Sequence, residues 1–126
     1  MLGDIRKTIR ESITRDDYEL LCEEIRDMLT EEFGEHYVQI IDASALLVSL
    51  NPEQKKRYGV HGAELARKDV VAMVKNTMHT VTGEHSTDIS TTSMKVFEIS
   101  GVRAAVTIYD HDTLYVRVVL RLGAGQ

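Results

Sequence analysis

The residues best suited to hold a ligand lie in the last quarter of the chain. Two alternating segments, 102–109 and 113–122, place Arg103, Tyr109, Tyr115 and Arg117 on the polar side of a predicted hairpin. Guanidinium groups bind carboxylate or phosphate through paired hydrogen bonds, and three arginines, at 103, 117 and 121, share this face. The four arginine and tyrosine residues are therefore the candidate site for an anionic small molecule.

The residue pattern supports metal binding and covalent catalysis less well than it supports anion binding. The five histidines are spread along the chain without the close spacing of a zinc site, and the single cysteine, Cys22, has no histidine near it in sequence. The serines lie outside any Gly-x-Ser-x-Gly turn, and no phosphate-binding glycine loop is present. We therefore predict no catalytic residue, no metal site and no cofactor.

The acidity of the chain is concentrated in one segment. The net charge is −5, but residues 16–35 hold nine acidic side chains and one base, Arg26, which leaves +3 for the remainder. Such a charged face either keeps an amphipathic helix in solvent or meets a basic partner. Because the hairpin arginines have the opposite sign, we predict that this acidic helix covers or flanks their face.

Apolar spacing predicts two main helices and a short one between them. Thr14 is the expected N-cap of the acidic helix and Gly34 its stop, while Asn51 opens a brief helix over 52–58. The longest pattern runs over 62–82, and its broad apolar band predicts burial on two sides, against the sheet and against a second copy of the chain. The expected self-association residues are Ala66, Val70, Met73, Val74 and Met78.

Strand-forming residues fill most of the remaining segments. Residues 37–50 indicate two short strands with a turn at 42–44, or one bent strand, and 96–99 indicates another. Residues 86–93 are either a polar connection or an exposed strand start. In the last hairpin the apolar residues must share a face, and a three-residue loop at 110–112 achieves this by pairing Ile108 with Leu114.

Together these elements predict a single α+β domain. We expect a mixed or antiparallel sheet of about five short strands, with a long helix and an acidic N-terminal helix packed on it. The expected parts are a helical segment at 1–15, a core at 16–122 and a flexible tail at 123–126. A chain of 126 residues, 43% hydrophobic, is long enough to fold without a disulfide. With no continuous apolar run at the start or elsewhere, a cytoplasmic protein without a membrane partner is expected.

The order and length of these predicted elements resemble those of the roadblock domain, found in dynein light chains and prokaryotic GTPase regulators and part of the wider profilin and longin-like group. The resemblance covers residues 16–122, from the acidic helix through the strand pair and the long helix to the last three strands. It implies a homodimer that pairs through the long helix and a neighbouring edge strand, and a small GTPase as a partner.

Two classes of function follow from the sequence. The favoured interpretation is a small cytosolic interaction or regulatory module, homodimeric and without catalytic activity. The alternative is a ligand-binding or enzymatic domain that holds an anionic small molecule on the arginine and tyrosine face. Nucleic-acid binding is the least favoured, because it requires that face to be uncovered and the acidic helix opposes it.

Overall fold

The computed structural model describes residues 13–91, 94–110 and 115–122, without the side chains of Tyr109, Asp110 and Tyr115. Residues 1–12 of the helical segment predicted at 1–15, and the tail predicted at 123–126, lie outside this description. The elements are α2 (Arg15–Phe33), the 3-10 turn η1 (Glu35–Tyr37), β1 (Val38–Asp42), β2 (Ala45–Val48), α3 (Pro52–Tyr58), the 3-10 turn η2 (Gly59–His61), α4 (Gly62–Thr82), β3 (Thr87–Asp88), β4 (Lys95–Ile99), β5 (Val102–Asp110) and β6 (Tyr115–Leu122).

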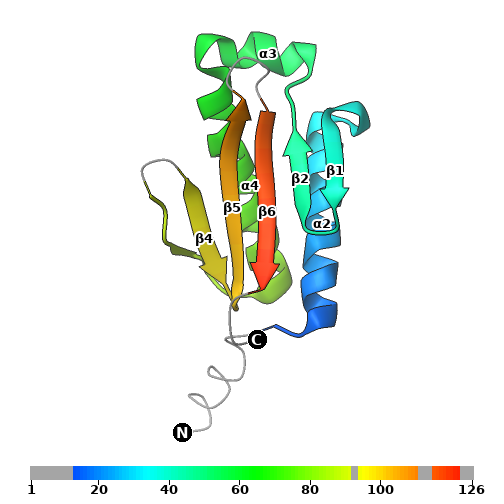
Figure 1. Ribbon diagram of the computed structural model, residues 1–126, viewed down its shortest axis with the longest axis vertical. Coiled ribbons are helices and arrows are strands. Elements are labelled where there is room, and N and C mark those ends of the chain that lie inside the picture. The colour runs from blue at the N-terminus through cyan, green and yellow to red at the C-terminus, as the bar shows by residue number, and fades with distance from the viewer. Residues whose placement is uncertain (1–12, 92–93, 111–114, 123–126) are drawn as a thin grey trace, which may run out of the picture.

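The strands form one antiparallel sheet in the order β1-β2-β6-β5-β4-β3 (Figure 1). The predicted α+β class is confirmed. The sheet has six strands instead of about five, because Thr87 and Asp88, inside the segment read as a polar connection or a strand start, pair with β4.

The ends of the helices follow local signals in the sequence. Thr14 caps α2 by accepting a hydrogen bond from the backbone N–H of Asp17 at 3.1 Å, and Gly34 ends that helix. Gly83 ends α4 in the left-handed conformation with φ of 75°, which suits a residue without a Cβ. These ends are at the residues predicted from the sequence.

A side-chain joint connects the end of α2 to the start of α3. Asn51 and Gln54 form a capping box at the N-terminus of α3. The same two side chains also donate hydrogen bonds to α2, from Asn51 Nδ2 to the carbonyl of Phe33 at 3.1 Å and from Gln54 Nε2 to the carbonyl of Glu32 at 3.3 Å. The joint therefore satisfies carbonyl groups that a helix C-terminus leaves without intrahelical partners.

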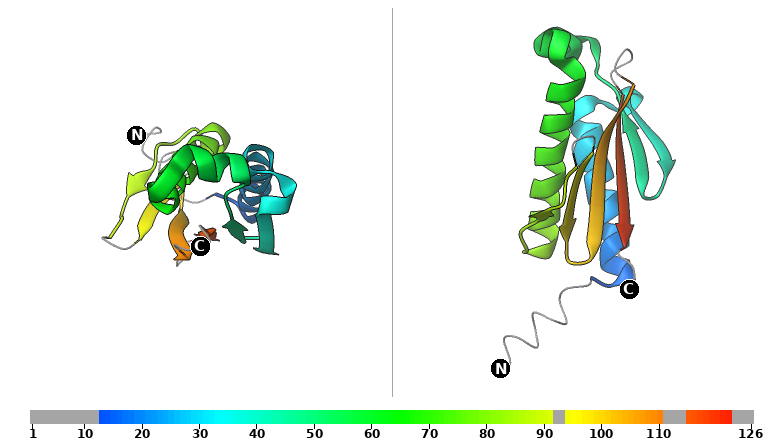
Figure 2. Two further views of the ribbon diagram at one scale, coloured as in Figure 1. Left: turned by 90° about the horizontal axis from the view of Figure 1, so that it is seen from above. Right: turned by 60° about the vertical axis from the view of Figure 1, so that its left-hand side comes forward.

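Both long helices lie on the same face of the sheet (Figure 2). The apolar stripe of α2 is at most 1% exposed, and the stripe of α4 beside it is buried equally well. Together they cover the inward side chains of β2, β4, β5 and β6, and this layer is the hydrophobic core. The two stripes consist of Leu21, Ile25, Leu29 and Phe33 on α2 and of Ala66, Val70, Val74 and Met78 on α4.

The prediction that the acidic helix covers or flanks the arginine face is wrong. The helix packs on the opposite, apolar face of the sheet, where its stripe joins the core. Full burial of one large apolar side chain contributes roughly 1.5–3 kcal/mol, whereas an exposed ion pair contributes about 0–1 kcal/mol. The apolar stripe therefore decides which face the helix covers, and its acids point to solvent.

The register of the final hairpin differs from the prediction by two residues. Ile108 pairs with Val116 instead of Leu114, and after an irregularity Asp110 pairs with Tyr115. The predicted three-residue loop is therefore wrong, although the apolar residues do share one face as expected. Alternation fixes only whether a shift is odd or even, so it cannot separate two registers that differ by two residues.

Candidate interaction face of the sheet

The face of the sheet opposite the helices, here called the outer face, is the candidate functional site. Within the described parts of the chain, both long helices lie on the other side of the sheet and none covers this face (Figure 2). The outer face receives every second side chain of the strands. Those of β5 and β6 are Arg103, Ala105, Thr107, Arg117, Val119 and Arg121.

A row of aliphatic side chains crosses the middle of the outer face. Val119 pairs with Ala45 on one side and with Ala105 on the other, and Ala105 pairs with Val96, which is only 8% exposed. Ile89 continues the row, because its N–H donates to the carbonyl of Val96 at 2.9 Å. Strands lie about 4.8 Å apart, so five positions span about 19 Å. We call this set of five residues the aliphatic row.

Arginines flank the aliphatic row on both sides. Arg103 pairs across the strands with Arg121, whereas Arg117 lies beyond the row, opposite Thr107. Arg103 forms an ion pair with Glu98 of β4, with 3.2 Å between Nη2 and Oε2. Among the described residues, no carboxylate oxygen lies within 4.0 Å of the side-chain nitrogens of Arg117 or Arg121. Three arginines and Glu98 thus give these residues a net charge of +2.

The structure brings the four predicted ligand-binding residues only partly together. Arg103 and Arg117 share the outer face, but Arg117 is four residues from the pairing partner of Arg103, about 13 Å along the strand. Only if both long side chains extended towards each other along the sheet would the two guanidinium groups meet at one small anion. Tyr109 and Tyr115 lie on β5 and β6, with side chains outside the described set. Sequence reasoning assigned no role to Ala45, Val96 or Ile89, because the row depends on pairing between distant strands.

The predicted self-association residues lie mostly inside the chain. Ala66, Val70, Val74 and Met78 are at most 1% exposed in the chain's own core, and Met73 packs partly buried against it. The broad apolar band of α4 has this extent because the helix covers several strands and also packs beside α2. These four buried side chains present no surface to a second copy.

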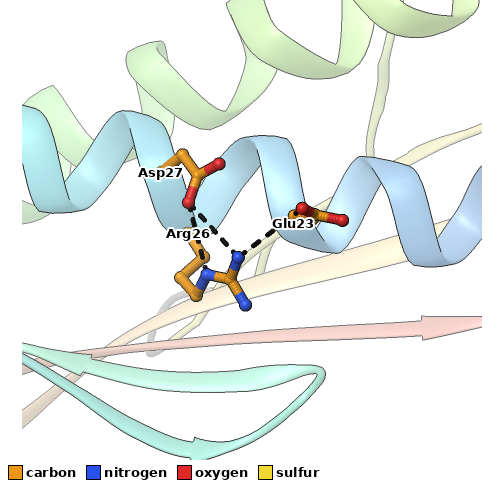
Figure 3. Close-up of polar contacts among 3 residues, drawn as sticks. All are labelled: Glu23, Arg26 and Asp27. Atoms are coloured by element: carbon orange, nitrogen blue, oxygen red, sulfur yellow. Dashed lines mark hydrogen bonds and ion pairs between the residues drawn. The ribbon is translucent and has the colours of Figure 1, made fainter.

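The acidic surface of α2 lies on the helix side, away from the outer face. Figure 3 shows its single internal base, Arg26, whose Nη2 is 3.3 Å from Asp27 Oδ1 and 3.9 Å from Glu23 Oε1. Arg26 thus pairs with acids of its own helix and leaves the surface strongly negative. The acids of α2 and the arginines of the sheet therefore occupy opposite sides of the molecule.

The groups that could carry covalent or metal chemistry are not assembled into a site. Cys22 is buried in the core, and this burial raises the pKa of its thiol, which disfavours the nucleophilic thiolate. The rings of His79 and His85 stack with centroids 4.5 Å apart, and Nδ1 of His79 lies 2.8 Å from the carbonyl of Glu84. In the described segments, no three His, Cys, Asp or Glu side chains are grouped to hold a metal ion.

Comparison of the chain with protein-family models, curated proteins and solved structures finds no match. The helices of residues 13–91, 94–110 and 115–122 include none with the length and apolar character needed to cross a lipid bilayer. The described residues form a two-layer α+β domain in which neither long helix covers the outer face and three arginines lie on it.

Proposed function

We propose that this chain is a small cytosolic interaction module, without catalytic activity, that binds an acidic partner protein through the outer face of its sheet. The observation that carries the proposal is the aliphatic row enclosed by arginines on a face that no described helix covers. A single buried cysteine is consistent with a reducing compartment.

The composition of the outer face matches what protein interfaces use. Interface centres are apolar, and arginine is enriched there because its planar group combines apolar area with directed hydrogen bonds. The aliphatic row supplies the apolar centre, while Arg117 and Arg121 supply donors for partner carboxylates. A second copy of the same face would place arginines against arginines, so the charge favours a partner with acidic residues around an apolar strip.

An anionic small molecule is a weaker candidate for this face. Arg117 lies about 13 Å along the strand from the pairing partner of Arg103, and the aliphatic row lies between them, so the two guanidinium groups are not arranged side by side around one small pocket. The aliphatic row is about 19 Å long, so a partner that contacts all of it must be as long as two to four turns of an α-helix, at about 5.4 Å a turn. A protein segment therefore fits the outer face better.

The test uses a synthetic amphipathic helical peptide with leucines on one face and glutamates beside them. In an NMR titration, amide shifts are expected at 103–107 and 117–121, and Arg117→Glu combined with Arg121→Glu should weaken binding at least tenfold. The matched control, Lys55→Glu with Lys56→Glu on α3, makes the same charge change elsewhere and should bind like the wild type. Shifts confined to α2 and α4, or equal losses in both variants, would refute the proposal.

Self-association is a second candidate, favoured by the exposed edge of β1. This strand ends the sheet, and two adjacent side chains on it, Ile40 and Ile41, are 56% and 50% exposed. An exposed apolar edge strand is a template for pairing with another strand. A second copy joined there would extend the sheet and leave both outer faces accessible.

A further inference from the structure

A groove separates the first half of α4 from the start of β4. Its volume is about 330 Å³, close to the lower limit of the roughly 300–1,000 Å³ typical of small-molecule sites. The groove is distinct from the outer face, because α4 lies on the other side of the sheet. Its lining residues are Glu64, Arg67, Lys68, Val71 and Lys95.

The groove collects positive charge from two elements. Arg67 and Lys68 come from α4, Lys95 begins β4, and Glu64 is the one acid, which gives a lining charge of +2. No carboxylate oxygen of the described residues lies within 4.0 Å of the nitrogens of these three cations. Their charges are therefore available to a ligand.

The groups next to the groove include one further cation and one acid. Lys75, one turn beyond Val71 on α4, has its Nζ 5.2 Å from the centre of the Phe97 ring. Asp88 has a pKa below its usual value, because the hydroxyl and N–H of Ser90 donate to it and because Lys75 and Lys95 stabilise its charge. Asp88 thus offsets part of the charge of Lys95, which leaves Arg67 and Lys68 as the main cations of the groove.

We propose that this groove binds the phosphate group of a small phosphate monoester. A phosphate monoester carries about −1.5 to −2 at neutral pH, which complements the lining charge of +2. Arg67 supplies a planar pair of donors, and the two lysines supply point charges. Val71 contacts the carbon part of the ligand, so an ester binds more tightly than inorganic phosphate.

The experiment titrates the full chain with glycerol 3-phosphate and follows backbone amides by NMR. Shifts are expected at 64–71 and around residue 95, with affinity at least threefold higher than for inorganic phosphate. Lys68→Glu combined with Lys95→Glu should weaken binding at least tenfold, whereas Lys55→Glu with Lys56→Glu should not change it. Glu64→Gln removes the opposing charge and should tighten binding about threefold.

Three results would overturn the proposal. The first is that no backbone amide shifts at 10 mM ester. The second is that both double variants lose the same affinity for the ester. The third is equal affinity for the ester and for inorganic phosphate, which would indicate a site for the free anion. Thermal unfolding of each variant identifies losses caused by misfolding, and Glu64→Gln tests the same site by a gain in affinity. Because the acidic peptide binds the other side of the sheet, failure here leaves the proposed function intact.

Discussion

The joint between α2 and α3 gives a quantitative test of how the helices are held together. The side chain of Gln54 is 2% exposed, and both of its polar atoms are used. Its Oε1 accepts from the N–H of Asn51 at 3.1 Å, and its Nε2 donates to the carbonyl of Glu32 at 3.3 Å. Gln54→Ala removes both bonds and truncates a buried side chain.

The expected loss follows from these contacts. Each hydrogen bond contributes about 1 kcal/mol to the free energy of unfolding, and a buried carbonyl left without a partner adds to the loss. We therefore expect Gln54→Ala to lower the free energy of unfolding by about 2–3 kcal/mol. At about 4 °C per kcal/mol for a domain of this size, the melting temperature falls by about 8–12 °C. Urea denaturation and thermal melting, both followed by circular dichroism, measure the two quantities.

The controls separate the joint from general effects on α3. Lys55→Ala changes the neighbouring exposed residue and should cost under about 0.5 kcal/mol. Asn51→Ala and Gln54→Ala remove parts of one network, so the double variant should lose less than the sum of the two single losses. A loss below about 0.5 kcal/mol for Gln54→Ala, or strict additivity with Asn51→Ala, would refute the reasoning.

Two further predictions concern Tyr58 and the β1 edge. The hydroxyl of Tyr58 donates to Asp69, and burial together with this carboxylate raises the pKa of Tyr58 from 10.0 to about 12. The phenol of the unfolded chain ionises first, so stability is complete below pH 10 and is lost as the pH rises towards 12. After allowance for partial solvent exposure, the loss in free energy of unfolding is about 1–2 kcal/mol. Urea denaturation at pH 9 and at pH 11.5 measures this loss, which should be larger for the wild type than for Tyr58→Phe. Equal losses in the two proteins would contradict the prediction. For the edge, light scattering should show a dimer that Ile40→Lys converts to a monomer, while Val60→Lys, at a site 96% exposed, leaves it a dimer; a monomeric wild type at high concentration would exclude self-association.

Local signals in the sequence were sufficient to place the helix ends. Thr14, Asn51 and Gly83 act through backbone groups within a few residues of themselves, so their roles can be read without knowledge of the tertiary fold. The α+β class and the shared apolar face of the last hairpin were likewise predictable from periodicity. These features depend on contacts that are near in sequence or on alternation along one segment.

The remaining features depend on choices that periodicity leaves open. The hairpin register differs from the predicted one by two residues. A shift of two keeps every side chain on the same face, so alternation could not reveal it. The position of α2 was predicted from charge, although its buried stripe, including Leu21 and Phe33, contributes far more than surface ion pairs. The aliphatic row could not be predicted, because it needs the pairing of Ala45 with Val119 across strands far apart in sequence.

The placement of both helices on one side makes the molecule an electric dipole. Residues 15–35 carry nine acids against Arg15 and Arg26, a charge of −7 on the helix side, which +2 on α3 and +1 on α4 offset only in part. On the outer face, the three arginines and Glu98 carry +2. An approaching acidic protein is repelled by one side and attracted by the other, so it is turned towards the arginines before any contact forms. This orientation acts before contact and therefore raises the rate of association. Because charges more than about 8 Å apart are largely screened at physiological ionic strength, the effect weakens as salt is added.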